Sequence, residues 1–438
     1  MSSRPLSRPT SGADRWFEIK SQVHLKLLNT LSPEQLKALN KDGVRAQIGQ
    51  LVERLVVDGG IPMTAVERDR VIEEVQDEVF GLGPLEQLLK DPTISDIMVN
   101  GFDNVYIEKG GRLIETNVRF KDQAHLRMII DRIVSNVGRR IDDSSPIVDA
   151  RLEDGSRVCA VIPPLALIGP VMSIRRYGKK LLTTEDLLKN FTLTHGILDF
   201  LSGCVEARLN IVISGGSGSG KTTLLNTMSR FIPEDERVIT IEDTAELQMQ
   251  QPHVVRLETR PSNIEGAGAV TARDLVINTL RMRPDRIIVG ESRGPEALDM
   301  LQAMNTGHDG SMTTVHANTV RDAFSRLEIM VMMASQNVPD KVIRQQLASA
   351  INLVVQCARL SDGSRKVVSI AEVVGVDHEQ VDMQDLFEFE RTGLSPRGKV
   401  VGRFRGLGNL PHCLDKLKGY GIHLSKSIFS EVVEVADK

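Results

Sequence analysis

The residues with the clearest capacity for chemistry form a glycine-rich segment in the middle of the chain. It reads Gly215-Gly216-Ser217-Gly218-Ser219-Gly220-Lys221-Thr222 and is followed by Thr223. The segment fits G-x-x-x-x-G-K-[ST], a pattern whose glycines let backbone N–H groups approach and bind phosphate oxygens. In this pattern Lys221 neutralises the β- and γ-phosphates of a nucleotide, and Thr222 is a ligand of Mg²⁺. We call residues 215–222 the phosphate loop and include Thr223 in the predicted binding segment.

The segments on either side of the phosphate loop favour this interpretation. Residues 210–214 are a short apolar run typical of a strand, and residues 223–228 read as the start of a helix. The N-terminus of such a helix also attracts an anion. The alternative is a flexible Gly/Ser loop, which a preceding strand and a following helix disfavour.

Three more apolar runs end in residues that can do chemistry. Residues 237–241, 286–289 and 311–315 lead to Glu242, to Glu291 after Gly290, and to His316. Strands and helices alternate between residues 184 and 360, which predicts an α/β fold with a parallel sheet. Ligands bind at the carboxyl ends of the strands in such sheets, so we expect all three side chains near the phosphate loop.

Each of these side chains has a predicted role in phosphoryl transfer. Glu291 is the expected catalytic acid that polarises the attacking water. Glu242 is expected to bind Mg²⁺ or its waters, and Asp243 and Glu246 compete for that role. His316 is expected to report the γ-phosphate through a hydrogen bond, although a lone histidine is more often structural.

Arginine residues offer the positive charge that such a site needs on its open side. Arginine suits the γ-phosphate because its planar guanidinium binds two oxygens at once. Any single arginine is as readily a surface ion pair, but a group around a predicted hairpin at Asp154-Gly155 stands out. The candidates are Arg281 and Arg283 on the same domain as the phosphate loop, and Arg151, Arg157, Arg175 and Arg176 on the domain before it.

Composition limits the remaining function classes. The 438 residues carry a net charge of −4, so no basic footprint points to nucleic acid as a direct partner. The four cysteines form no C-x-x-C pair, so neither a zinc knuckle nor a redox pair is indicated. The N-terminus has no apolar signal core, and the longest uncharged run, 158–174, contains three prolines. We therefore expect a soluble protein of the cytoplasm.

Changes in composition divide the chain into five parts. The predicted parts are a disordered tail at 1–13, a helical N-terminal region at 14–80, a small α+β domain at 81–177, a linker at 178–183, and the α/β domain with a C-terminal extension at 184–438. Residues 351–359 and 366–376 are predicted to form a hairpin around Asp362-Gly363, and the tail is predicted to end in a helix.

The motifs together resemble the four boxes of the type II/type IV secretion ATPase superfamily. The phosphate loop resembles its Walker A box, and residues 241–247 resemble its Asp box. Residues 288–291 resemble its Walker B box, and residues 307–318 its His box.

Other segments resemble particular branches of that superfamily. Residues 149–158 and 173–176 are similar to the N-terminal domain motif of the type IV secretion branch, and residues 280–286 also fit. The tail segments 386–389 and 402–404 resemble the CpaF-type ATPase of tight-adherence (Flp) pili. The chain lacks the tetracysteine zinc module that some other branches carry.

The resemblance implies a RecA-like P-loop motor domain, a PAS-like α+β N-terminal domain and an N-terminal helical bundle. It implies a homohexamer that binds ATP and Mg²⁺, hydrolyses ATP, and closes arginines of the N-terminal domain on the γ-phosphate. Such a ring is peripheral at the cytoplasmic face of the inner membrane and drives pilus assembly through a platform protein, and retraction of the pilus by the same motor stays open. Two alternatives stay open: a type IV secretion traffic ATPase that moves protein or DNA, and a nucleotide-gated scaffold without significant turnover.

Overall fold

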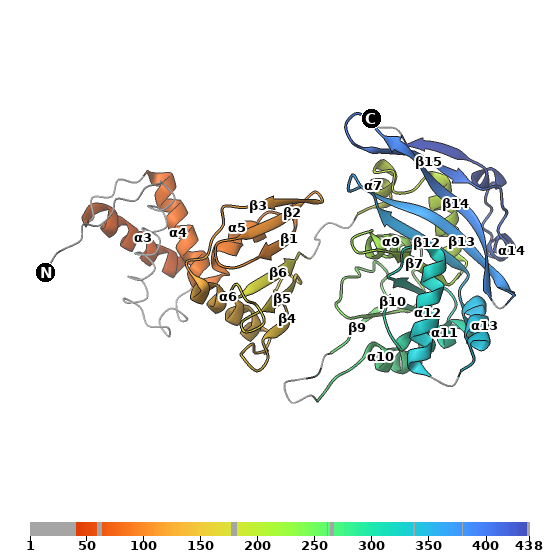
Figure 1. The fold of residues 1–438 in the computed structure, drawn as a ribbon, viewed down its shortest axis with the longest axis horizontal. Helices are drawn as coiled ribbons and strands as arrows, with labels where there is room; N and C mark the ends of the chain where they lie inside the picture. The colour runs from red at the N-terminus through yellow and green to blue at the C-terminus, as the bar shows by residue number, and fades with distance from the viewer. Residues whose placement is uncertain are drawn as a thin grey trace. The chain divides into compact units, whose positions relative to one another are not determined.

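The computed structural model describes residues 41–58, 64–176, 182–260, 262, 267–335, 338–378 and 380–435. The chain divides into two compact units, Met1–Lys179 and Lys180–Lys438 (Figure 1). The predicted disordered tail, the helices predicted within residues 14–40 and most of the predicted linker lie outside the described residues.

Two helices open the described part of the N-terminal unit, α3 (Lys41–Asp58) and α4 (Ala65–Phe80). Both occur where the apolar spacing predicts a helix. Thr64 starts α4 with a capping box, because its side chain and that of Glu67 each accept a backbone N–H of the other residue. The two helices contact each other, and Val52 of α3 and Val75 of α4 are both buried.

The rest of the N-terminal unit is an antiparallel sheet with one long helix. The six strands lie in the order β3-β2-β1-β6-β5-β4. Their bounds are β1 (Ile94–Val99), β2 (Val105–Lys109), β3 (Arg112–Glu115), β4 (Ile147–Arg151), β5 (Arg157–Val161) and β6 (Val171–Arg175). Short helical turns at Gly83–Leu85 (η1) and Glu86–Leu89 (α5) lead into the sheet.

Helix α6 (Gln123–Asn136) supplies one side of the core of this unit. Leu126, Ile129, Ile130 and Ile133 recur at the spacing of one helix face, and all are buried against residues of the sheet. Leu85 of η1 and Leu88 of α5 belong to the same core, so α6 and these short turns together cover the apolar face of the sheet.

The C-terminal unit is built on a sheet of ten strands in the order β16-β15-β14-β13-β12-β7-β11-β10-β8-β9. Five neighbouring pairs, from β12 through β9, run parallel, as the alternation of strands and helices predicts. The bounds of these strands are β7 (Ile211–Gly215), β8 (Val238–Glu242), β9 (Val254–Glu258), β10 (Arg286–Ser292), β11 (Met312–Val315) and β12 (Leu353–Arg359).

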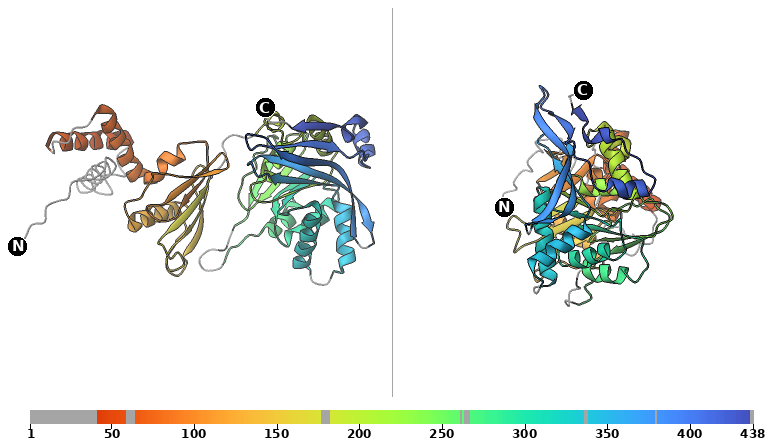
Figure 2. Two further views of the ribbon diagram at one scale, coloured as in Figure 1. Left: turned by 45° about the horizontal axis from the view of Figure 1, so that its top comes forward. Right: turned by 90° about the vertical axis from the view of Figure 1, so that its right-hand side faces the viewer.

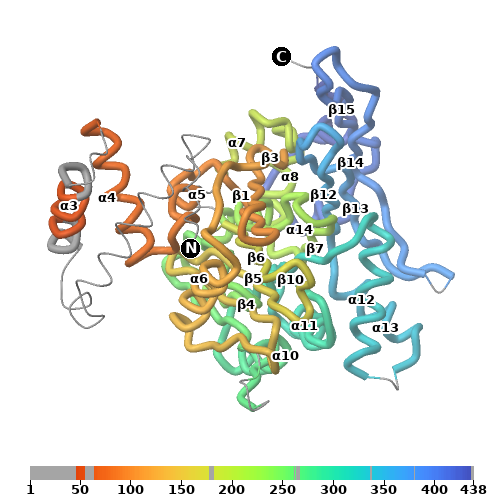
Figure 3. The backbone as a smooth tube through the Cα atoms, turned by 60° about the vertical axis from the view of Figure 1, so that its left-hand side comes forward, coloured from red at the N-terminus to blue at the C-terminus, as the bar shows by residue number. Residues whose placement is uncertain are grey.

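Helices cover both faces of the parallel strands, so strand residues are buried on both sides. In β7, Ile211 and Ile213 pack into one core and Val212 into the other. The first core contains α8 (His195–Glu206) and α9 (Lys221–Ser229), preceded by the short α7 (Thr184–Lys189). Figure 2 shows the helices of the second core gathered on one side of the sheet. They are α10 (Ala272–Thr279), α11 (Glu296–Asn305), α12 (Val320–Ala334) and α13 (Asp340–Ala350), and the tube in Figure 3 shows α12 beside α13.

The C-terminal extension continues the same sheet with antiparallel strands. The predicted hairpin around Asp362-Gly363 is confirmed by the pairing of β12 with β13. The extension comprises β13 (Arg365–Asp377), β14 (Gln380–Leu394), β15 (Val400–Gly406), α14 (Leu414–Gly419), η2 (Lys426–Phe429) and β16 (Val432–Val435). The tail contains the predicted helix as α14, but the last described element is a strand and not a helix. Residues 432–435 are mostly β-branched and pair with β15 instead.

No helix within the described ranges is both long enough and apolar enough to cross a membrane.

Candidate nucleotide-binding site

The phosphate loop connects the buried strand β7 to helix α9. Gly215 ends β7, and α9 begins at Lys221. A Cβ on Gly215 would lie 2.5 Å from the carbonyl oxygen of Cys357 on the neighbouring strand and would also overlap the Ser219 hydroxyl. Only glycine fits there, so the first glycine of the pattern is required by the packing of β7 against β12.

The side chain of Lys221 folds back over the loop in this structure. Its Nζ donates hydrogen bonds to the carbonyl oxygens of Gly215, at 2.9 Å, and Gly216, at 3.1 Å. The same nitrogen lies 3.4 Å from Nδ1 of His316. The charge that would meet the β- and γ-phosphates is therefore held at the mouth of the loop beside the predicted γ-phosphate sensor.

The predicted catalytic residue Glu291 lies between His316 and a cation that sequence analysis missed. Its Oε1 is 3.6 Å from His316 Nδ1. Its Oε2 accepts hydrogen bonds from Nε and Nη2 of Arg293, at 2.9 and 2.5 Å. Arg293 also donates from Nη1 to Oδ2 of Asp243, at 3.1 Å. Burial lowers the pKa of the Arg293 guanidinium, but the hydrogen bond and charge of Glu291, together with Asp243, raise that pKa overall.

These contacts form a continuous polar network at the carboxyl ends of four parallel strands. It runs from Asp243 through Arg293, Glu291 and His316 to Lys221. Thr314 fixes the strand ends beside it, because its hydroxyl donates to the carbonyl oxygen of Gly290 at 2.7 Å. The structure therefore brings Glu291 and His316 to the phosphate loop, as the strand-end argument predicts.

Glu242 is buried at the end of β8, with a relative exposed area of 4%. Its Oε2 accepts the backbone N–H groups of Glu246, at 2.7 Å, and Leu247, at 2.8 Å. Its Oε1 is buried and has no hydrogen-bond partner in the described structure. Burial raises the pKa of Glu242, although the two backbone N–H groups act in the opposite direction.

The surroundings of Glu242 fit a role near Mg²⁺. A buried carboxylate oxygen without a partner is costly unless a ligand or water meets it. The competing residue Asp243 is engaged by Arg293 and by the Thr259 hydroxyl, which donates to it at 3.1 Å. No group of three or more metal-binding side chains occurs among the described residues. Mg²⁺ at a phosphate loop needs only one or two protein ligands besides phosphate and water, so Thr222 and Glu242 suffice.

Arg281 and Arg283 are not brought to the phosphate loop of their own chain. They precede β10, which begins at Arg286 and runs parallel to β8 and β11. A strand of this length spans about 20 Å, so both arginines lie at the amino edge of the sheet, opposite the loop. This placement corrects the expectation that they act at the site of the same subunit.

The other four predicted arginines lie in the N-terminal unit, and three of them are in register. Arg151 on β4 pairs with Arg157 on β5, which pairs with Arg175 on β6. Arg176 differs, since its side chain is 7% exposed and its Nη1 donates to the carbonyl oxygens of Leu88 and Asp91. These contacts give Arg176 a structural role in its own unit.

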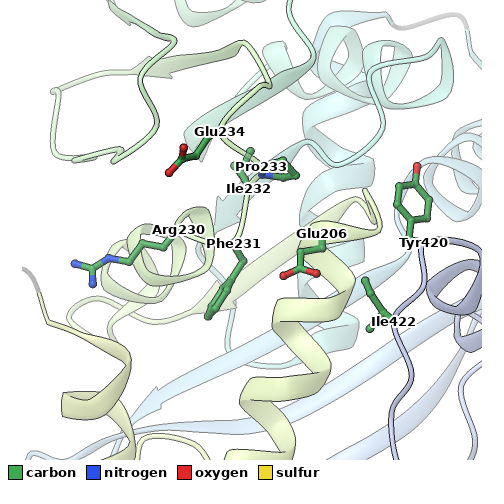
Figure 4. A pocket seen from close by; sticks show the side chains of 8 residues that line it. All are labelled: Glu206, Arg230, Phe231, Ile232, Pro233, Glu234, Tyr420 and Ile422. Carbon is green, nitrogen blue, oxygen red and sulfur yellow. The ribbon is translucent and has the colours of Figure 1, made fainter.

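A separate pocket of about 420 Å³ lies at the far end of α9 (Figure 4). It is lined by Glu206, Arg230, Phe231, Ile232, Pro233, Glu234, Tyr420 and Ile422. Arg230 follows the last residue of α9, whereas Lys221 begins that helix. The helix separates this pocket from the phosphate loop, so the pocket is not part of the nucleotide site.

A phosphate loop at the carboxyl edge of a parallel sheet, flanked by two carboxylates and a histidine, defines a P-loop nucleotide-binding protein. The family model described as "Type II/IV secretion system protein" matches residues 78–395. The chain belongs to this family.

Several relatives share most of their length with this chain. A Mycobacterium tuberculosis (strain H37Rv) protein with a provisional conjugal-transfer name is 38% identical, over 68% of this chain and 86% of its own length. The conjugal transfer protein TrbB of Rhizobium radiobacter is 34% identical, over 70% of this chain and 91% of TrbB. The VirB11 ATPase from the Brucella suis type IV secretion system, whose crystal structure is in complex with sulphate, is 30% identical in sequence to this chain. That comparison covers 69% of this chain and 96% of that one, with a TM-score of 0.37.

Proposed function

We propose that this protein is an ATPase whose turnover drives a secretion or pilus machine. The observation that carries the proposal is the polar network that joins Glu291 and His316 to Lys221 at the phosphate loop. A protein that only binds a nucleotide needs the loop, but it has no use for a carboxylate placed to polarise water.

Residues of the C-terminal unit have different roles in the proposed hydrolysis. Backbone N–H groups of the phosphate loop bind the phosphates, and Lys221 moves from the loop carbonyls to the β- and γ-phosphates. Glu291 orients the attacking water, while Arg293 fixes the direction of its carboxylate. His316 senses the γ-phosphate from its place between Glu291 and Lys221.

Thr222 and, through waters, Glu242 would hold Mg²⁺, which would supply positive charge to the phosphate oxygens. The unpartnered Oε1 of Glu242 gives that carboxylate a free acceptor for such a water.

The assembly that fits this chemistry is a homohexamer of RecA-like motor domains with PAS-like N-terminal domains. We assign the γ-phosphate arginine to Arg151, Arg157 or Arg175, because their cross-strand register concentrates positive charge in one row. Nucleotide contacts favour one arrangement of the two units, and loss of the γ-phosphate removes that preference.

The proposed machine is a tight-adherence pilus, assembled through an inner-membrane platform protein. The ring works in the cytoplasm, is peripheral to the membrane through that partner, and makes no direct contact with nucleic acid. Support comes from the tail segments 386–389 and 402–404, the second of which lies beyond the matched family region. The second candidate is a type IV secretion traffic ATPase, which the conjugal-transfer names of the relatives favour.

The first test is the ATPase rate of the full-length protein against its concentration, with the mass in solution measured alongside. We expect turnover per subunit to rise as hexamers form. Full turnover by a monomer would argue against the ring, and hexamers that bind ATP without hydrolysing it would favour the scaffold.

The second test distinguishes the two machines. Deletion of the gene in its own host should remove surface fibres seen by electron microscopy and leave substrate transfer between cells intact. Loss of transfer with normal fibres would instead support the traffic ATPase.

A further inference from the structure

Two arginines on the β12–β13 hairpin lie against the phosphate loop. Arg359 is the last residue of β12, Arg365 is the first of β13, and the two are direct cross-strand partners. Strand β12 pairs with β7 in a register that sets Cys357 opposite Gly215. Arg359 therefore lies just past the start of the phosphate loop, and Arg365 lies beside it.

Arg365 is hydrogen-bonded to the loop, and Arg359 lies close to it. Arg365 donates from Nε to the carbonyl oxygen of Gly218 at 2.8 Å. A Cβ on Gly220 would lie 3.4 Å from Cδ of Arg365, and a Cβ on Gly218 would lie 3.6 Å from Nη1 of Arg359. The hairpin thus covers the part of the loop where Gly218 and Gly220 have positive φ values of 67° and 99°.

A direct pair of like charges is an unusual way to end a hairpin. Opposed like charges on neighbouring strands destabilise a sheet, and an anion bound beside the pair would reduce the repulsion. The carboxylate in the turn itself, Asp362, bonds to Ser364 and to the backbone N–H of Val400. A phosphate group bound at the loop would add negative charge close to both arginines.

We propose that the β12–β13 hairpin is a cationic brace of the phosphate loop, with Arg365 as a positioning residue for nucleotide binding. Arg365 holds the Gly218 carbonyl, and this fixes the neighbouring backbone N–H groups in the direction of the phosphates. Arg359 adds positive charge beside the same loop. The inference rests on the proposed ATPase function and names a part of the site that lies outside the four boxes.

The brace also links the nucleotide to the C-terminal extension. Strand β13 begins at Arg365 and pairs with β14 along most of its length. A change at the phosphate loop therefore reaches the extension through one hydrogen bond and one continuous strand. This link predicts that nucleotide binding protects the hairpin as well as the loop from hydrogen exchange.

The test begins with Arg365→Gln in the full-length protein. We expect its dissociation constant for Mg·ADP, measured by calorimetry, to rise about tenfold, which is the loss of one charge-assisted hydrogen bond. The KM for ATP should rise in parallel, while kcat changes less than about twofold, because ground-state and transition-state binding weaken together. Arg365→Lys, which keeps a donor for Gly218, should recover most of the affinity.

Two further variants separate the brace from general destabilisation. Arg405→Gln is the matched control, since Arg405 is a partly exposed arginine on β15 of the same sheet that pairs with Glu388 and Glu390. It should leave Mg·ADP binding unchanged. Arg359→Gln should weaken binding by a smaller factor than Arg365→Gln, because it removes charge but not the bond to Gly218.

Hydrogen exchange on the wild-type protein gives a readout that does not depend on any variant. Mg·ADP should slow exchange at residues 216–220 and also at residues 360–365. Wild-type affinity in Arg365→Gln, an equal loss in Arg405→Gln, or protection of the loop alone would overturn the brace. A wild-type protein that binds no Mg·ADP would instead overturn the proposed function itself.

Discussion

At the level of single residues, the two carboxylate oxygens of Glu291 have different partners. Oε2 is held by Arg293, whereas Oε1 faces His316 at 3.6 Å and is the oxygen available to a water. The Arg293 contact fixes the orientation of the carboxylate and leaves Oε1 available to orient a water. This division explains why a cation directly beside the expected catalytic acid is compatible with its role.

We predict that Glu291→Gln lowers kcat by about 10²–10³ while Mg·ADP affinity stays the same, because the carboxamide keeps the shape but loses the basic oxygen. Phosphate release and calorimetry are the measurements. Glu234→Gln, in the pocket at the far end of α9, is the matched control and should keep wild-type turnover. Wild-type turnover in Glu291→Gln would move the catalytic acid elsewhere.

Glu242 should show a conflict between stability and function. Its pKa is raised by burial, so its contribution to stability is present below the unfolded pKa and is lost as pH rises through the folded pKa. At pH 8 the buried charge is a cost, and Glu242→Gln removes it. We expect the variant without nucleotide to melt above wild type at pH 8, with the difference shrinking at pH 5.

Turnover of Mg·ATP by Glu242→Gln should fall, since the neutral side chain binds metal-bound water less well. Thermal unfolding at the two pH values and a turnover assay at pH 8 check both statements. A variant that melts below wild type at pH 8 would show that the carboxylate stabilises the apo fold.

Sequence patterns located the acids and the histidine because strand ends are predictable. An apolar run that stops at Glu242, Glu291 or His316 fixes the position of each along the chain, and parallel pairing brings the ends together. Arg293 and Arg365 gave no such signal. Their roles depend on side-chain direction and on a hairpin far from the loop in sequence, since 147 residues separate Arg365 from Gly218.

At the level of elements, Asn210 joins the starts of three strands. Its Oδ1 accepts the backbone N–H groups of Gly310 and Ser311, at 2.8 and 3.0 Å, ahead of β11. Its Nδ2 donates to the carbonyl oxygen of Ala350 at 2.7 Å, and its own N–H donates to Oδ1 of Asn352. One buried side chain thus aligns β7 with β11 and β12 at the edge opposite the site.

We predict that Asn210→Ala lowers the free energy of unfolding by about 2–4 kcal/mol, because it leaves several buried backbone groups without partners. Urea unfolding of the full-length protein measures the change. Asn409→Ala, which removes one exposed bond to the Asp385 carbonyl oxygen, should cost about 0.5 kcal/mol. Equal losses in the two variants would contradict the alignment role of Asn210.

Element types were predicted best where the pattern is long and bounded by turn residues. The parallel strands and the hairpin at Asp362-Gly363 are such cases. The final strand β16 was not predicted, because four residues carry no periodicity and its conformation depends on pairing with β15. Tertiary pairing, rather than local preference, decides the structure of so short a segment.

At the level of the whole molecule, the residues predicted to act on the nucleotide are distributed over the two compact units. The C-terminal unit contains the phosphate loop, Glu242, Glu291 and His316, and it has its own two-layered core. The N-terminal unit contributes the row of Arg151, Arg157 and Arg175. If these arginines bind the γ-phosphate, binding and hydrolysis should be separable between the units.

We therefore predict that residues 182–438 alone fold and bind Mg·ADP within about threefold of the full-length affinity. Their ATP turnover should be lower by about 10³, the usual effect of removing an arginine from a phosphoryl-transfer site.

Full-length protein with Arg151, Arg157 and Arg175 all replaced by Gln should show the same loss of kcat with unchanged ADP affinity, because ADP has no γ-phosphate. The matched control replaces Arg281 and Arg283, which lie at the far edge of the sheet in their own subunit. Full turnover by the isolated unit would show that hydrolysis needs nothing from the N-terminal unit, and it would remove the reason for a closure of the two units during the cycle.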